Sequence, residues 1–378
     1  MSLALSTLIY EWRRYLAAVI ALAVAGLLVL AMTGMFMGMA LSFTATVDKS
    51  PAQILILPPQ AEGLFGDSGQ PRRMIPMVYE HPGVAEVQPM IMNWAMWSNF
   101  PKDGQPAKGD GVRVVVVDPV KGAVTLPSDF SDATIEALKE PFAVILDRTS
   151  LGKLGVQVGD KAKMNGRTVT VAGVVDGYPN MFNTQVFTSY QTAKLIYVAD
   201  DGPRVGPLLV KLKDPTRAKQ VAAELNVLGA GQFKAWTREE LSKSSQMGMM
   251  KEGGIAIMVG FMALVGVFIG IVITWQTLQG AILANIKEFA SLRALGVSMG
   301  ELRLIIIELS FWVGVAGLIL TVVLISGVAM LAKVGGVPMD FPLFLDIPVA
   351  IMLMIIAILS GLFSLGILKK SQPADLLR

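Results

Sequence analysis

The chain has 378 residues, of which 53% are hydrophobic and 16% are charged, and its formal net charge is +3. So small a net charge gives no reason to expect a nucleic-acid partner. The sequence contains no cysteine and a single histidine, His81. A disulfide framework and a thiolate metal site are therefore excluded, and the lone histidine argues against a histidine-based metal centre.

The apolar residues gather in four blocks, each long enough to cross a bilayer as a helix. We therefore predict membrane spans at residues 15–41, 254–283, 303–332 and 347–368, preceded by an amphipathic segment at residues 1–14. The first block follows Arg13 and Arg14, as a signal peptide follows its basic flank. Its apolar run is about twice the usual signal length, which favours an uncleaved anchor.

Lysine and arginine placement predicts the orientation of the spans. The loop at residues 284–302, the first segment and the tail at residues 369–378 are rich in basic residues, whereas Lys333 faces Asp340 and Asp346 in the loop at residues 333–346. We expect both termini and the loop between the second and third spans to be cytoplasmic, in a multi-pass protein of the bacterial inner membrane. Residues 42–252 are then extracytoplasmic.

This outer segment is predicted to be a mixed α/β domain. Apolar runs at residues 53–57, 112–117 and 143–146 are typical of buried strands, and Asn165-Gly166 predicts a hairpin with a type I′ turn. Asp214-Pro215 predicts a helix start, and Thr237-Arg238-Glu239-Glu240 has the pattern of a capping box. A strand–helix–strand alternation between residues 206 and 236 suggests a small α/β sandwich.

No residue pattern in the outer domain indicates catalysis. Asp147, Asp160 and Asp176 lie beside predicted turns, where we expect them to cap or solvate the chain. No Gly-x-Ser-x-Gly elbow is present. Two groups of side chains are candidates for an apolar substrate or partner surface: Trp94 and Trp97 on one strand face, and Met247 and Met250 near the membrane. Core packing explains the tryptophans equally well, and methionines at helical spacing more often serve ordinary packing.

The loop at residues 284–302 carries a short amphipathic helix. Ile286, Phe289, Ala290 and Arg293 share one helical face, and Gly296 ends the helix. Ser298-Met299-Gly300-Glu301 is a second capping box, which starts the third span. The alternative interpretation is a helix lying on lipid, but the mixed charge of the polar face argues against lipid as its only partner.

The same segment resembles the coupling-helix signature of the MacB/FtsX (type VII) class of ABC transporter permeases. The topology of one span, a large outer domain and three further spans is also similar to that class, as are Glu308 and the tail at residues 372–378. A narrower similarity, to DevC-type glycolipid exporter permeases, rests on residues 71–73, 97–99 and 117–119. The resemblance assigns ATPase coupling to Ile286, Lys287, Glu288, Phe289, Leu292, Arg293, Ala294, Leu295 and Gly296.

The resemblance implies a non-catalytic permease subunit that dimerises and binds a cytoplasmic ABC ATPase, which holds the ATP and magnesium; this chain itself is expected to bind no cofactor. Membrane lipids surround the spans, and a periplasmic adaptor (membrane fusion protein) and an outer-membrane channel are expected partners of an exporter.

Export of a lipid or hydrophobic small molecule is the first hypothesis. The alternatives are FtsX-like signalling to a cell-wall hydrolase and a lipoprotein-releasing permease. An outer domain of about 210 residues, larger than FtsX-type domains, favours export.

The sequence contains no Gly-x-x-x-x-Gly-Lys-Ser/Thr loop, which leads to a first prediction. The purified chain should show no ATP hydrolysis, because it has no P-loop to hold the nucleotide phosphates. Turnover should begin only when a separate ATPase is co-purified with it. Phosphate release is the measurement, and vanadate-sensitive turnover by the isolated chain would contradict the assignment.

Overall fold

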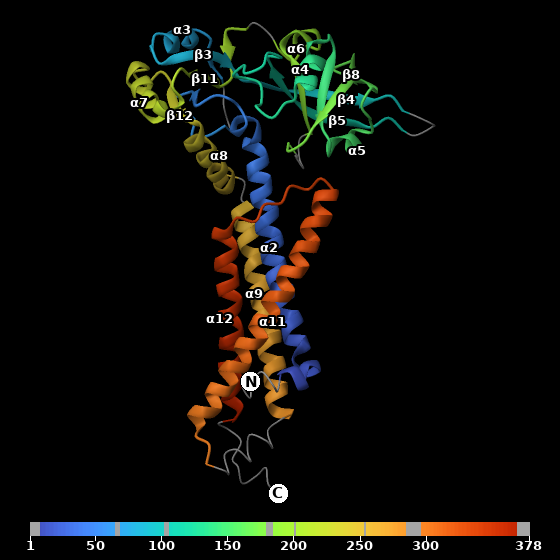
Figure 1. The fold of residues 1–378 in the computed structure, drawn as a ribbon, viewed down its shortest axis with the longest axis vertical. Helices are drawn as coiled ribbons and strands as arrows, with labels where there is room; N and C mark the ends of the chain where they lie inside the picture. The colour runs from blue at the N-terminus through green and yellow to red at the C-terminus, as the bar shows by residue number, and fades with distance from the viewer. Residues whose placement is uncertain are drawn as a thin grey trace. The chain divides into compact units, whose positions relative to one another are not determined.

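A computed structural model describes residues 8–64, 69–101, 106–178, 184–199, 202–252, 255–284 and 296–368. The chain divides into two compact units, one of long helices and one that is mixed α/β (Figure 1). Residues 39–255 and 335–338 form the α/β unit, and the helical unit takes the rest. The predicted fold class is confirmed, because four apolar helices long enough to span a membrane are present and the α/β unit is inserted between the first and second.

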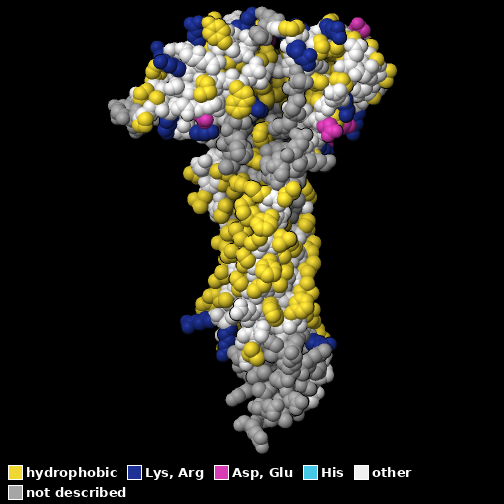
Figure 2. Space-filling model, turned by 180° about the vertical axis from the view of Figure 1, so that it is seen from behind, with side chains coloured by type: hydrophobic (Ala, Val, Ile, Leu, Met, Phe, Trp, Pro, Cys, Tyr) yellow, Lys and Arg dark blue, Asp and Glu magenta, His cyan; other side chains and the backbone are white. Residues whose placement is uncertain are grey.

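Among the described residues, four long helices build the helical unit: α2 (Trp12–Asp48), whose last turns belong to the α/β unit, α9 (Ile255–Ala284), α11 (Met299–Val334) and α12 (Leu343–Leu368). Their shared core includes Leu22, Val313 and Leu353. Gly26 of α2 lies where a Cβ atom would come within 2.6 Å of Leu353 and 2.8 Å of Thr321, so a larger residue would force these side chains to shift. Figure 2 shows hydrophobic side chains over most of the visible face of this unit, as expected of a lipid-exposed surface.

One lobe of the α/β unit is built on a four-stranded sheet in the order β12-β1-β11-β3, with all neighbours antiparallel. All four residues of β1 are buried, because alternate side chains enter two separate cores on opposite faces of the sheet. The lobe comprises β1 (Ile54–Leu57), β2 (Gln70–Pro71), α3 (Met74–Tyr79), β3 (Val84–Pro89), β10 (Arg204–Val205), β11 (Leu208–Leu212), the 3₁₀ helix η1 (Pro215–Arg217), α7 (Ala218–Leu228), β12 (Lys234–Thr237) and α8 (Arg238–Glu252).

The second lobe is a closed barrel with the strand order β4-β5-β9-β6-β8-β7. Val112, Val114 and Val116 of β5 point into the barrel, while Val115 and Val117 pack against Ile135 and Leu138 of α4 on its outer surface. The barrel lobe comprises β4 (Ile91–Asn99), β5 (Gly109–Val117), α4 (Asp132–Lys139), β6 (Ala143–Asp147), α5 (Ser150–Leu154), β7 (Lys161–Met164), β8 (Arg167–Val175), β9 (Thr184–Ser189) and α6 (Tyr190–Leu195).

The hairpin, the helix start and the capping box predicted in the outer domain are all present. Asn165 and Gly166 have φ values of +48° and +78° and join β7 to β8, as a type I′ hairpin requires. The Asp214 side chain accepts a hydrogen bond from the Thr216 amide at 3.0 Å, at the start of η1. In the predicted capping box, Thr237 and Glu240 bond each other's backbone amides, both at 3.3 Å.

The fold allows a test of the predicted orientation, since the chain has no native cysteine. We expect Val158→Cys to react from outside with a membrane-impermeant maleimide in spheroplasts, because its side chain is 53% exposed on the α/β unit. Ser291→Cys, in the loop predicted to be cytoplasmic, should react only after lysis. Mass-tagged maleimide on a gel is the readout, and labelling of both cysteines in intact spheroplasts would overturn the orientation.

Candidate functional site

The start of α11 has the glycine turn and the capping box that the sequence predicts. Gly296 has a φ of +96°, which side-chain-bearing residues rarely adopt. The Ser298 amide donates to Glu301 at 2.8 Å and the Glu301 amide donates to the Ser298 hydroxyl at 3.2 Å, so the predicted capping box is formed. The other predicted coupling residues, 286–295, lie outside the described residues, and their helix remains a prediction.

The far end of α2 is bonded to both lobes of the α/β unit. Thr46 donates from its hydroxyl to the Gln185 side chain of β9 at 3.1 Å, and both residues are buried. The Ser242 hydroxyl of α8 donates to the Asp48 carboxylate at 3.2 Å. Immediately after α2, Arg238 donates to the Ser50 carbonyl at 2.7 Å. The helix therefore ends in a polar junction that contacts the barrel and α8 together.

Lys49 forms the charged part of this junction. Its ammonium lies 2.8 Å from the Asp129 carboxylate and 3.8 Å from the centre of the Tyr178 ring, and it donates to the Gly177 carbonyl at 3.0 Å. The Tyr178 hydroxyl also donates to Asp129, at 2.6 Å. Burial and the hydrogen bond to Asp129 raise the pKa of Tyr178, so the phenol stays protonated at neutral pH.

The three turn aspartates have the structural roles that the sequence predicts. The buried Asp147 carboxylate accepts from the amides of Thr149 at 2.9 Å and Tyr178 at 2.8 Å. Asp160 accepts from the Gln157 amide at 2.8 Å. Asp176 forms a two-bond pair with Arg148, at 2.8 and 3.2 Å, and the hydrogen bond from that guanidinium lowers the pKa of Asp176.

The prediction that Trp94 and Trp97 share one strand face is wrong. The two residues are three positions apart on β4, and an odd separation places side chains on opposite faces. Trp97 is 1% exposed inside the barrel, whereas Trp94 is 55% exposed outside it. Met247 is exposed on α8. Met250 belongs to the same helix, but its side chain lies outside what the structure describes.

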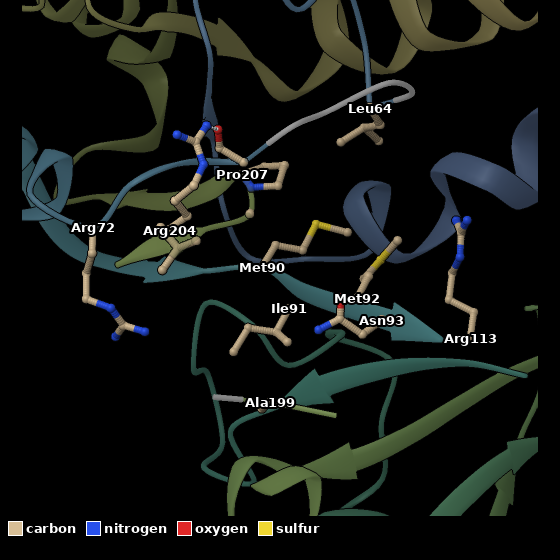
Figure 3. A pocket seen from close by; sticks show the side chains of 13 residues that line it. Leu64, Arg72, Met90, Ile91, Met92, Asn93, Arg113, Ala199, Arg204 and Pro207 are labelled. Atoms are coloured by element: carbon tan, nitrogen blue, oxygen red, sulfur yellow. Dashed lines mark hydrogen bonds between the residues drawn. The ribbon is translucent and has the colours of Figure 1, made fainter. Parts of the chain in front are cut away.

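A cavity of about 460 Å³ lies between the two lobes (Figure 3). Arg72 and Arg204 come from the sheet lobe, and Arg113 comes from β5 of the barrel. Sequence reasoning missed this site because its arginines are spread over more than 130 positions and share no motif. The cavity is lined by Leu64, Gly69, Arg72, Met90, Ile91, Met92, Asn93, Arg113, Ala199, Arg204, Val205, Gly206 and Pro207.

Two family models match the sequence. The MacB-like periplasmic core domain matches residues 15–228, which is more than half of the chain, and the FtsX-like permease C-terminal region matches residues 260–373. The first match takes in most of α2 and most of the α/β unit, and the second takes in most of α9 together with α11 and α12. A comparison with curated protein sequences finds no match.

Three solved structures are similar to the chain. The periplasmic region of MacB from Actinobacillus actinomycetemcomitans is 14% identical, with a TM-score of 0.34, and the match covers 52% of this chain and 94% of that one. The extracellular domain of the noncanonic ABC-type transporter YknZ from Gram-positive bacteria is 14% identical, with a TM-score of 0.33 and coverages of 49% and 99%. A permease domain from Porphyromonas gingivalis is 12% identical, with a TM-score of 0.28 and coverages of 49% and 86%.

The junction at Lys49 gives a prediction about stability. Lys49→Met removes a charge-assisted bond from a side chain that is 31% exposed, at a cost of about 1–3 kcal/mol. We expect the thermal midpoint of the α/β unit to fall by about 3–8 °C. The matched control is Lys121→Met, which breaks a 2.7 Å pair with Asp132 in which the lysine is 78% exposed. The control should move the midpoint by less than about 2 °C, and equal shifts would contradict the role of Lys49.

Proposed function

Because the chain belongs to the MacB/FtsX class of ABC transporter permeases, we propose that it is the permease subunit of an ABC-type exporter. A separate cytoplasmic ATPase hydrolyses ATP, and the permease converts this into motion of its α/β unit. The substrate is a lipid or hydrophobic small molecule taken from the outer leaflet or the periplasm. A second permease copy, a periplasmic adaptor and an outer-membrane channel complete the proposed assembly.

The continuity of α2 is the observation that carries this proposal. Its 37 residues form one helix of about 55 Å, whereas a bilayer core is about 30 Å thick. The helix therefore continues well past the hydrocarbon, and its last turns bond to the barrel through Thr46 and to α8 through Asp48. A displacement of this helix along its axis acts on both lobes at once.

The second part of the proposed mechanism is the transfer of motion from the ATPase to α11. The positive φ of Gly296 turns the chain just before α11, and the capping box at Ser298 and Glu301 fixes the first turn of this helix. A helix that starts at a rigid turn follows the segment before it, whereas a flexible linker would absorb the motion. We propose that residues 286–296 dock on the ATPase and that α11 moves with them.

The α/β unit favours export over signalling to a cell-wall hydrolase. It contains two lobes with separate cores and a cavity between them. Ligand sites occur preferentially at such interfaces between domains. A partly open cavity between two lobes suits the binding of a small molecule, which an exporter requires.

Variants of the coupling segment test the proposal. Gly296→Val should reduce recovery of the ATPase, because a β-branched residue resists the φ of +96° that the turn requires. Glu288→Lys should also weaken binding, since loss of a desolvated charge partner typically costs about 2–5 kcal/mol. The measurement is a pull-down of the co-expressed ATPase together with substrate-independent ATP turnover.

Gly300→Val is the matched control for Gly296→Val. Gly300 lies in the first turn of α11, has no positive φ, and an added Cβ would meet nothing closer than 3.7 Å. This variant should retain the ATPase, and the α/β unit of every variant should resist protease as the wild type does. If Gly296→Val and Glu288→Lys both keep wild-type ATPase binding and turnover, the segment is only a helix lying on lipid.

A further inference from the structure

The four-stranded sheet of the first lobe ends in two outer strands, β12 and β3, each paired with a described strand on one side only. The inner strands β1 and β11 are paired on both sides. An outer strand presents N–H and C=O groups along its open edge, and such an edge is a template for a strand of another chain. The bonds that these outward groups make therefore decide whether the lobe can add a strand.

On β12, a side chain of α7 occupies the open edge. The Asn226 amide nitrogen donates to the Ala235 carbonyl at 2.9 Å, and the Asn226 side-chain oxygen accepts from the Ala235 amide at 2.7 Å. Backbone groups two residues apart point to the same edge, and the Thr237 amide donates to the Glu240 carboxylate at 3.3 Å. Asn226 thus makes both of the bonds that a neighbouring strand would make with Ala235.

On β3, a side chain of α3 occupies the edge in the same way. The Tyr79 hydroxyl accepts from the Val87 amide at 2.8 Å and donates to the Val87 carbonyl at 3.4 Å. Two residues further along the strand, Pro89 has no N–H to offer. Figure 1 shows α3 beside β3 and α7 beside β12. Each outer strand therefore has its own adjacent helix, and that helix supplies the side chain that closes the edge.

Core packing does not account for these two polar side chains. Asn226 is exposed and Tyr79 is 47% exposed. Holding an exposed side chain in one rotamer costs conformational entropy, and water alone could satisfy the outward groups of an exposed edge. In each case one side chain bonds both the N–H and the C=O of a single strand residue, which is what a hydrogen-bonded partner residue in an antiparallel sheet does. The two side chains take the place of a further strand.

We propose that Asn226 and Tyr79 are edge caps, which keep the sheet lobe from joining the sheet of a second copy of this chain. A second copy is the partner to be excluded, because two identical edges can pair antiparallel about a two-fold axis. Copies anchored in one membrane also share one orientation and a confined space. The inference goes beyond the proposed function and does not depend on the substrate that the permease exports.

Cross-linking of the full chain in detergent micelles tests the proposal at β12. Lys234→Cys places the only cysteine at the exposed start of this strand, where a short bis-maleimide joins two copies whose β12 edges meet. Adding Asn226→Ala removes both bonds to Ala235. The protein concentration that gives half-maximal cross-linking should then fall roughly ten-fold. Faster hydrogen exchange of the Ala235 amide at low concentration verifies that the cap is lost.

Two controls separate edge pairing from general loss of structure. Asn99→Ala is the matched variant, because Asn99 also bonds one backbone carbonyl and one backbone amide, at 2.9 and 2.7 Å, but lies in the barrel. It should leave cross-linking through Lys234→Cys unchanged. Val158→Cys reports contacts made by the barrel lobe, and Asn226→Ala should not increase cross-linking at that position.

The β3 edge gives a second test, which also serves if Asn226→Ala fails to fold. Tyr79→Phe removes only the hydroxyl and keeps the ring in place. With the single cysteine at the exposed position of Ala85→Cys, the half-maximal concentration should fall roughly three-fold or more. Tyr197→Phe is the matched control, because it removes a hydroxyl that accepts from Arg167 at 2.7 Å. This control should have no effect.

Two results would overturn the proposal. Unchanged cross-linking at both edges, together with faster exchange of the freed amides, would show that an uncapped edge does not recruit a second copy. An equal increase at Val158→Cys would show that the variants aggregate through unfolded chains and not through the strand edge.

Discussion

The last turns of α2 are hydrogen-bonded to the barrel through Thr46 and Gln185 and to α8 through Asp48 and Ser242. The proposed transmission of motion to the α/β unit depends on this junction. An apolar helix by itself only anchors a domain. Because α2 is one unbroken helix of 37 residues, no linker separates its apolar part from the turns that bond to Gln185 and Ser242. Next to these bonds, Lys49 adds an ion pair with Asp129 and a contact with the Tyr178 ring.

The sequence predicted those parts of the fold that depend on neighbouring residues. The hairpin at Asn165-Gly166 follows from the positive φ that its turn requires. The capping box at Thr237 follows from the need to hydrogen-bond the free amide groups at a helix start. The barrel was not predicted, because its closure depends on β4 pairing with β7 and on β5 lying parallel to β9. Pairings between such distant strands leave no periodic signal in one stretch of sequence.

The candidate sites also divide into those made of adjacent residues, which the sequence predicted, and those assembled from distant residues, which it did not. The turn at Gly296 and the capping box that follows it were evident from a dozen adjacent residues, and both are present. The tryptophan surface failed because the spacing of three between Trp94 and Trp97 is incompatible with one face of a strand. The arginines of the cavity come from a turn, a barrel strand and a two-stranded ribbon, and only the assembled lobes bring them to one cavity.

The place of β1 in its sheet has a consequence for how the protein is made. Residues 54–57 form an inner strand, bonded on one side to residues 208–210 and on the other to residues 234–237. A nascent chain therefore carries β1 with both edges open until about 150 further residues have been synthesised, and with one edge open until β12 follows. During that interval residues 54–57 have no native strand partner, and open apolar edges are prone to aggregation. The barrel lobe, encoded entirely within this interval, can close first, so biogenesis has a natural order in which the sheet that frames the barrel is completed last.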